Sequence, residues 1–356
     1  MLSIDQPNLE EFIRVIVRKK PQIQTQNMNE VQVVINQRDN SIQVNNNSNE
    51  TSEASTFYFD TIFDEKSTQQ QIYDNAVSPL VNSLFQDINS TIWAFGQTRS
   101  GKSQTLFGNK CDEQNQGIVY RAIDQIFSQI KHLSDTKEEQ KEINEEYKVY
   151  VSVYTLYREQ LEDMLVDQRK DLRIRQNLDQ IYIENLTKIQ ISNQQEFQDV
   201  LQNGIKKNLI NITYRSLLQS KEYFFIEVSI LKTNKILGIE QMSYLKIVEF
   251  QGCERSKKPL NQTQFSENSQ INKGLTHFCQ VISALTDEKS THVPYRDSKI
   301  TRIMQDALGG NSRGLMICNL NTQLEYHEIL YNLRVASRVQ QVRNHIFFNK
   351  KQSTDL

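Results

Sequence analysis

One short segment of the sequence has the spacing of a phosphate-binding loop, reading GQTRSGKS through Gly96, Gln97, Thr98, Arg99, Ser100, Gly101, Lys102 and Ser103. Gly96 and Gly101 let the backbone turn so tightly that successive N–H groups can point at phosphate oxygens. Lys102 would supply positive charge to the β- and γ-phosphates, and the Ser103 hydroxyl could bind Mg²⁺. The apolar segment 91–95 directly precedes the loop, as such a site requires, and a helix after it would add its dipole. The segment predicts a nucleotide site. The alternative is a loop that keeps the pattern without binding.

A candidate metal ligand lies at the end of a second apolar run, where Glu249 closes LKIVE before Phe250. Nucleotide sites form at the carboxyl ends of parallel strands, so this carboxylate could bind Mg²⁺ directly or through water. Gly252 follows and could offer its N–H to a γ-phosphate. Taken alone, Glu249 is equally well a surface carboxylate at a strand end, and Lys102 upstream favours the metal-binding interpretation.

Regular elements must hold these residues in place. Apolar and alternating runs predict strands at 12–21, 91–95, 149–157, 224–231, 245–250 and 315–320. Three- and four-residue apolar steps predict helices at 119–130 and 326–343. Strands that alternate with helices indicate an α/β fold with a central, largely parallel sheet and helices on both faces. No linker divides the chain, so we expect one large domain.

Composition limits the possible classes. The chain has 356 residues, with 41 basic and 43 acidic side chains and a formal charge of -2. Near-neutral charge disfavours a nucleic-acid-binding protein, and no apolar run is long enough to predict a membrane span. Four cysteines without metal-binding spacing indicate a reducing compartment. Residues 37–56 are polar and rich in Asn, so we expect a surface loop there. The sequence predicts a soluble intracellular protein.

Four longer stretches carry further motifs: FDTIFDEKSTQQQIYDNAVSPLVNSLFQDINSTIWAFGQTRSGKSQTLFG (59–108), INKGLTHFCQVISAL (271–285), HVPYRDSKITRIMQDALGGNS (292–312) and LYNLRVASRVQQVRN (330–344). In this order they resemble the kinesin motor domain. The resemblance implies a single P-loop NTPase domain of kinesin type at 12–344, with a central mixed, largely parallel sheet, after an extension at 1–11 and before a tail at 345–356. It also implies ATP or ADP with Mg²⁺ as ligands and the microtubule as partner. Only the short tail follows Asn344, so we expect no self-dimerising coiled coil in this chain.

The resemblance assigns roles to individual residues. Those beside the adenine would be Arg18, Lys20, Pro21 and Tyr73, and those around the phosphates would be Gly96 to Ser103. Ser103 and Glu249 would bind the metal, and the catalytic residues would be Lys102, Gly252 and Glu254. Tyr73 has the aromatic face for stacking on a base. The alternative for Tyr73 is ordinary packing of an amphipathic helix.

The two switch segments depart from the family pattern. The second switch, usually D-x-x-G-x-E, reads EFQGCE, and Glu249 is one methylene longer than the usual aspartate. Mg²⁺ tolerates geometric error poorly, so weaker metal binding is expected. In the first switch, usually N-x-x-S-S-R-S-H, an ungapped alignment places Gln219 where the arginine stands, and both serines become leucine. A gapped register over 211–216 recovers an Asn and an Arg, and the sequence does not choose between the two. We expect nucleotide binding with slow or absent hydrolysis.

A local basic face would have to bind the acidic tubulin surface, because the chain as a whole is nearly neutral. The candidates are Lys257, Lys258, Lys273, Arg296, Lys299 and Arg302. The last three are spaced three apart and could share one helical face. The alternative is a solvated basic surface.

Two functions stay open from sequence: an ATP-driven microtubule motor, and a hydrolysis-impaired structural protein that binds microtubules. A small GTPase is disfavoured, because no base-reading NKxD-like run occurs in the right place.

Overall fold

The structure is a computed structural model that describes residues 9–21, 31–46, 54–109, 112–140, 145–166, 171–177, 180–212, 221–253, 262–350 and 352–353. Its largest element is a ten-stranded sheet with the main order β12-β8-β13-β14-β7-β15-β2-β6. The strands are β2 (Arg14–Lys19), β6 (Thr61–Phe63), β7 (Ser90–Phe95), β8 (Glu145–Tyr157), β9 (Gln160–Asp163), β12 (Ile189–Ile191), β13 (Tyr223–Asn234), β14 (Ile239–Glu249), β15 (Arg313–Leu320) and β17 (Gln352–Ser353). Each of the six strands predicted from sequence is present.

Strand direction divides this sheet into two parts. The four neighbouring pairs from β14 to β6 are parallel, and the three from β12 to β14 are antiparallel. The mixed, largely parallel sheet expected from sequence is confirmed. The phosphate-loop segment follows β7, in the middle of the parallel part, where carboxyl ends of strands meet at one edge.

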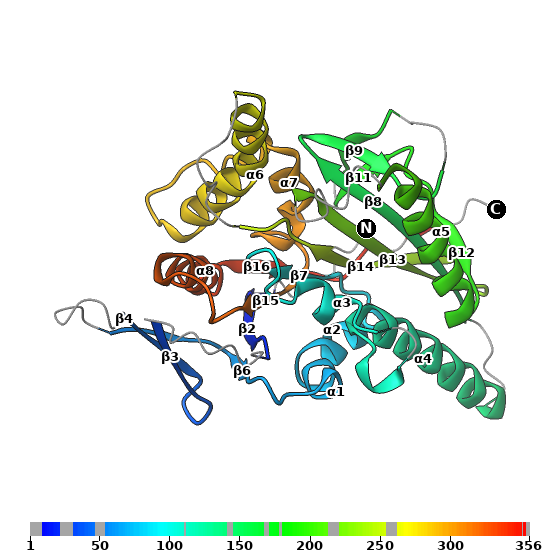
Figure 1. Cartoon of the computed structure of the whole chain (residues 1–356). Helices are drawn as coiled ribbons and strands as arrows, with labels where there is room; N and C mark the ends of the chain where they lie inside the picture. The colour runs from blue at the N-terminus through cyan, green and yellow to red at the C-terminus, as the bar shows by residue number, and fades with distance from the viewer. Residues whose placement is uncertain are drawn as a thin grey trace.

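Helices cover both faces of the sheet, as expected (Figure 1). Side chains alternate along β7, so that Trp93 and Phe95 pack on one face while Ile92 and Ala94 pack on the other. The first face is covered by α6 (Gln262–Thr286), α7 (Lys299–Ile303) and α8 (Tyr326–Val339). The second is covered by α1 (Gln69–Ile72), α2 (Ser78–Leu84), α3 (Lys102–Leu106), α4 (Ile118–Gln140) and α5 (Gln194–Ile212). Short helical turns are η1 (Tyr73–Val77), η2 (Glu113–Asn115), η4 (Tyr295–Asp297) and η5 (Gln305–Ala307).

A three-stranded antiparallel sheet corrects one expectation. It is formed by β3 (Val31–Asn36), β4 (Ser41–Asn46) and β5 (Ser55–Tyr58). The surface loop expected at 37–56 is therefore wrong for β4 and for the start of β5. Within the described part, the turn at 37–40 and the exposed Ala54 fit the expectation. Ile42 and Val44 are two residues apart and fully buried, so β4 has an apolar face that its polar composition concealed.

Two further strand pairs lie outside the main sheet. A hairpin is formed by β10 (Arg173–Gln176) and β11 (Ile181–Glu184), and β1 (Leu9–Phe12) pairs with β16 (Arg343–Ile346). The boundaries expected at residues 11/12 and 344/345 thus each fall inside a strand. Asn344 on β16 is buried, donates to the Ala307 and Ser312 carbonyl oxygens at 3.0 and 2.7 Å, and accepts from the Gly309 N–H at 2.7 Å.

We predict that Asn344→Ala lowers the free energy of unfolding by about 2–4 kcal/mol, because it leaves three backbone groups around one buried side chain without partners. Urea denaturation measures the difference. The control is His345→Ala on the exposed side of the same strand, which keeps the backbone bond from its N–H to the Gly310 carbonyl oxygen and should change stability little. Equal losses in both variants would contradict the role given to Asn344.

Candidate nucleotide site and basic face

The GQTRSGKS segment forms a tight loop between β7 and α3, and its glycines have the backbone conformations that the sequence implied. Gly96 has φ of +143° and Gly101 has φ of +103°. A Cβ atom at residue 96 would lie 2.4 Å from the Asn319 carbonyl oxygen and 2.7 Å from Ser100 Oγ, so only glycine fits there. Arg99 also has a positive φ, of +64°, and its carbonyl oxygen accepts from Lys20 Nζ at 2.9 Å.

Lys102 lies buried within the loop. Its ammonium group donates to the carbonyl oxygens of Gly96 at 2.8 Å and Gln97 at 2.7 Å, which keeps a positive charge at the centre of the turn. The helix that follows is only five residues long. The positive field of the loop therefore comes from Lys102 and the N–H groups of the turn rather than from a long helix dipole.

Two side chains of the loop have hydrogen-bonding groups without protein partners. The amide nitrogen and oxygen of Gln97 and the hydroxyl of Ser100 are buried and unpaired. An unpaired buried polar group costs about 1–3 kcal/mol, so native proteins seldom keep several together. The amide nitrogen and the hydroxyl are donors, and their position beside Lys102 fits a loop in which phosphate oxygens would accept from both.

Ser103 and Glu249, predicted as metal ligands, lie in contact. Ser103 Oγ donates to Glu249 Oε1 at 2.5 Å. The contact follows from the parallel pairing of β14 with β7, in which Glu249 stands opposite Ala94 at the start of the loop. Burial raises the pKa of Glu249, while Ser103 and the charge of Lys102 lower it. Among the described residues no cluster of three His, Cys, Asp or Glu side chains could hold a metal. A Mg²⁺ ion here would need one hydroxyl, one carboxylate and phosphate oxygens.

The second switch is described only as far as Cys253. The Phe250 N–H donates to the Ala94 carbonyl oxygen at 3.0 Å, and Cys253 Sγ donates to Asn332 Oδ1 on α8 at 2.7 Å. The switch strand is thus tied to both the phosphate-loop strand and α8. Glu254, Lys257 and Lys258 lie outside the described residues, as do 213–220 of the first switch. The roles of these residues and both first-switch registers remain predictions.

On the side predicted for the base, Arg18 and Pro21 line a cavity of about 900 Å³. Arg18 donates to Gln69 Oε1 at 3.0 Å and Thr105 Oγ1 at 2.8 Å, and burial lowers its pKa to about 10. The rest of the wall comes from residues 65–70, Gln104, residues 113–116, Arg121 and Asp124. Sequence reasoning missed the wall at 113–116. Asp112 before it and Gly117 after it are the residue types that flank such a turn.

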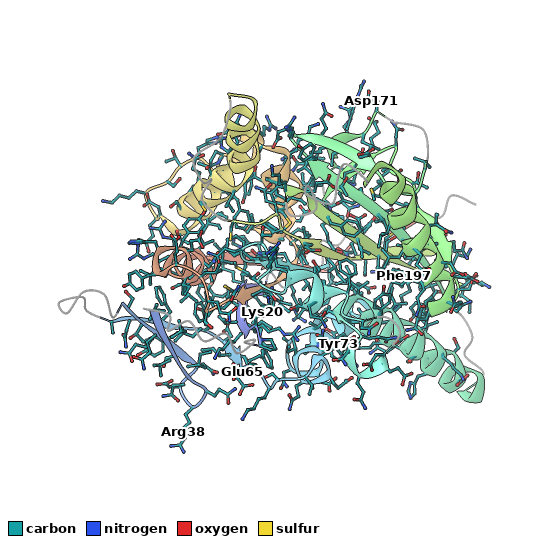
Figure 2. The ribbon with its side chains drawn as sticks, in the orientation of Figure 1. Lys20, Arg38, Glu65, Tyr73, Asp171 and Phe197 are labelled. Atoms are coloured by element: carbon teal, nitrogen blue, oxygen red, sulfur yellow. The ribbon has the colours of Figure 1, made fainter. Side chains whose placement is uncertain are left out.

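Tyr73 does not line this cavity. Its ring is buried in the core beneath the sheet, and its hydroxyl donates to Gln125 Oε1 at 2.5 Å. Figure 2 shows Tyr73 in the same part of the molecule as Lys20 and Glu65. The structure thus gives Tyr73 the helix-packing role that sequence reasoning held as its alternative, and its contact with a base stays a prediction.

The predicted basic face is brought together only in part. Lys273 is exposed on α6, and Arg296 is exposed on η4. The expectation that Arg296 shares one helix with Lys299 and Arg302 is wrong, because Ser298 caps α7 and the helix begins at Lys299. Arg302 donates to Gln176 Oε1 on β10 at 2.7 Å. Its pKa is lowered by burial and further by the charge of Arg296.

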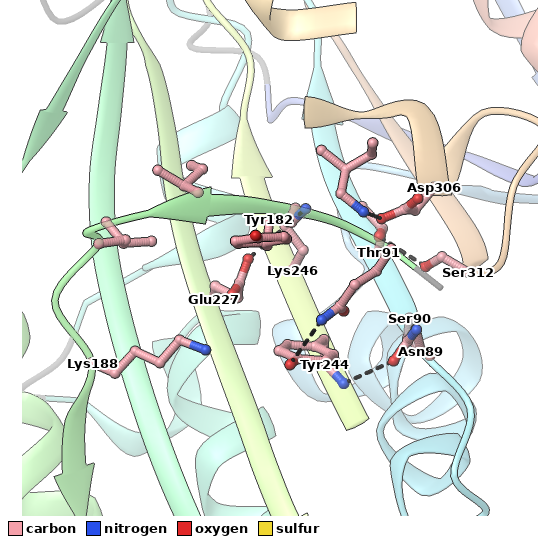
Figure 3. Close-up of a pocket in the computed structure, with 14 residues that line it drawn as sticks. Asn89, Ser90, Thr91, Tyr182, Lys188, Glu227, Tyr244, Lys246, Asp306 and Ser312 are labelled. Carbon is pink, nitrogen blue, oxygen red and sulfur yellow. Dashed lines mark hydrogen bonds and ion pairs between the residues drawn. The ribbon is translucent and has the colours of Figure 1, made fainter. Parts of the chain in front are cut away.

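A small polar crevice lies where the β10–β11 hairpin crosses the sheet (Figure 3). The Ile181 N–H on β11 donates to Asp306 Oδ2 on η5 at 3.0 Å. Lys246 Nζ lies 3.9 Å from Glu227 Oε2 and donates to the Ile303 carbonyl oxygen at 3.3 Å. The Ile181–Asp306 bond therefore ties the hairpin to η5, and Lys246 ties the sheet to the end of α7.

Comparison with known proteins identifies the family. The model of the kinesin motor domain matches residues 17–342. This chain belongs to the kinesin motor domain family. The kinesin heavy chain of Botryotinia fuckeliana is 32% identical over 346 residues, which cover 96% of this chain and 38% of that protein. Kinesin-related protein 3 of Dictyostelium discoideum is 31% identical over 350 residues, which cover 96% of this chain and 28% of that protein. A solved structure described as a fast kinesin matches with a TM-score of 0.83 and 31% identity, over 97% of this chain and 96% of that chain.

These matches confirm the kinesin fold that the sequence predicted, and they cover nearly all of this chain. The chain itself spans only 38% and 28% of the length of the two kinesin relatives. None of the helices in the described part of the chain is long and apolar enough to cross a bilayer.

We predict opposite effects of Glu249→Gln on stability and on metal binding. A carboxyl whose folded-state pKa is raised destabilises the fold at higher pH, and the penalty disappears as pH falls below that pKa. The nucleotide-free variant should therefore be more stable than wild type at pH 8, with the difference shrinking towards acid pH. Loss of the charge should weaken Mg²⁺-dependent nucleotide binding by about 10- to 100-fold.

Thermal unfolding across pH and nucleotide titration at fixed Mg²⁺ test both effects. Glu240→Gln, at the other end of β14, serves as the control. An unchanged Mg²⁺ dependence in Glu249→Gln would remove this carboxylate from the metal site.

Proposed function

We propose that this chain is an ATP-binding, microtubule-binding motor domain whose ATP hydrolysis is slow. The observation that carries the proposal is the contact of Ser103 with Glu249 beside a glycine-constrained loop that holds Lys102 and unpaired polar groups. Membership in the kinesin motor domain family supports ATP as the nucleotide and tubulin as the partner.

Different residues would bind the phosphates, the metal and the base of ATP. The N–H groups of Gly96 to Ser103 would surround the phosphates, and Lys102 would neutralise part of their charge. Ser103 and Glu249 would hold the metal. Arg18, Lys20 and Pro21 would flank the base. Bound Mg²⁺ supplies electrostatic stabilisation of the charge that develops on the transferred phosphate. Gly252 would offer its N–H to that phosphate, and Glu254 would help to orient the attacking water.

Slow hydrolysis follows from residue identities at the switches. Glu249 replaces an aspartate, which displaces its carboxylate by one methylene from the position that an octahedral metal prefers. Gln219, in the ungapped register of the first switch, cannot form the ion pair with Glu254 that an arginine would. Phosphoryl transfer depends almost entirely on positioning and charge, so such losses reduce the rate by orders of magnitude.

We predict that the protein binds ATP and ADP with Mg²⁺ but turns over ATP below about 1 s⁻¹ even at saturating microtubules, the low end of ordinary enzyme rates. A steady-state ATPase assay with and without microtubules, together with nucleotide titration, measures this. Microtubule-stimulated turnover well above this rate would contradict slow hydrolysis and would indicate an active ATP-driven motor. Binding to microtubules without measurable turnover would favour the second candidate, a structural microtubule-binding protein, which the Glu249 substitution also suits.

The microtubule face is proposed to include Lys273, Arg296, Lys299 and Arg302. We predict that reversing charge in Lys299→Glu with Arg302→Glu weakens microtubule co-sedimentation by roughly tenfold at low salt and less at high salt, because salt screens exposed charges. Arg38→Glu is the matched control, since Arg38 is exposed at the tip of the β3–β4 turn (Figure 2). Equal weakening by the control would mean that net charge, rather than this face, determines binding.

A further inference from the structure

The cavity beside Arg18 raises the question of what contacts the base, because none of the described residues that line it is aromatic. Tyr73 packs in the core instead. Part of the cavity wall is the turn at 113–116, and most of the side chains of that turn are exposed. A turn with few buried contacts needs another source of order if it is to hold a ligand in one position.

Arg121, in the first turn of α4, supplies that order. Its Nε donates to the Gln116 carbonyl oxygen at 3.0 Å. One terminal nitrogen donates to the carbonyl oxygens of Glu113 at 2.8 Å and Gln114 at 3.1 Å, and the other donates to Gln70 Oε1. A single guanidinium thus binds three carbonyls of the turn and one side chain of α1.

These contacts join two walls of the same cavity. Gln70 lines one side, and its amide nitrogen donates to Asp74 Oδ1 at 2.6 Å, which fixes its orientation. The carbonyls of the turn lie on the other side. The planar fork of arginine reaches both sides at once, whereas the ammonium of lysine is a single point charge and cannot.

We propose that Arg121 is a positioning residue that sets how long a nucleoside di- or triphosphate stays bound, by holding the 113–116 turn against α1 along the base side of the site. This inference rests on the proposed function, because it assumes that the cavity receives the base of the nucleotide. Arg121 makes no contact with the phosphate loop in the bonds described above, so its effect should fall on nucleotide release rather than on Mg²⁺ binding.

The test compares Arg121→Lys and Arg121→Ala with the full wild-type chain. Release of a fluorescent ADP analogue is measured by stopped-flow, in Mg²⁺ and without microtubules. We expect both variants to release the analogue on the order of tenfold faster, since several hydrogen bonds to a charged donor are lost. Amide hydrogen exchange at 113–116 should also become faster, a readout that needs no nucleotide.

Arg14→Lys is the matched control, because Arg14 also donates to a backbone carbonyl, that of Asn75 at 2.9 Å, and does not line the cavity. Wild-type release rates in Arg121→Lys, or equal acceleration in Arg14→Lys, would overturn the role of Arg121 and leave the proposed function standing. If the wild-type chain fails to bind the analogue, the proposed function is overturned, and so is the inference that rests on it. Arg121→Lys keeps the charge, so it covers the case in which Arg121→Ala fails to fold.

Discussion

The parallel pairing of β14 with β7 is the constraint on which the rest of the site depends. It sets Glu249 opposite Ala94, so the carboxylate lies at the start of the phosphate loop and meets the Ser103 hydroxyl. The next parallel neighbour, β15, ends at Asn319 and Leu320, and the Asn319 carbonyl oxygen closes the loop from the other side at Gly96. Three strands that are adjacent in the sheet but distant in sequence therefore form this turn: β7 leads into it, and β14 and β15 border it on either side. A shift of one residue in any of these registers would move a side chain to the opposite face of the sheet.

The phosphate loop and its surroundings bury charged and polar groups, which by itself disfavours folding. Glu249 is held where burial raises its pKa, Lys102 is buried against carbonyl oxygens, and Gln97 and Ser100 keep unpaired polar atoms. Apolar side chains on both faces of β7 stabilise the strand that carries the loop, and polar side chains concentrate at its carboxyl end. Functional sites commonly retain such local costs, which the surrounding core offsets.

Much of the fold could be predicted from sequence because apolar residues repeat with clear periods in the main strands and in α4 and α8. The same is true of the phosphate loop, since glycine, lysine and serine are required at fixed spacing. The β3–β5 sheet could not be predicted, because Ile42 and Val44 are only two apolar residues in a polar stretch and their burial depends on α8, far along the chain. The shared helix expected for Arg296 failed because the Ser298 cap decides where α7 begins. The 113–116 turn, which Arg121 holds, could not be predicted either. Arg121 binds its backbone carbonyl oxygens, and every residue type has such an oxygen.

The unpaired groups of the phosphate loop also have a meaning for the protein in a cell. A ligand that binds only the folded form stabilises it in proportion to the logarithm of its free concentration. Here the loop adds to that general effect, because the Gln97 amide nitrogen and the Ser100 hydroxyl are buried donors without protein partners, and phosphate oxygens would accept from both. A bound nucleotide would then stabilise the folded chain as well as serve as the substrate of the site.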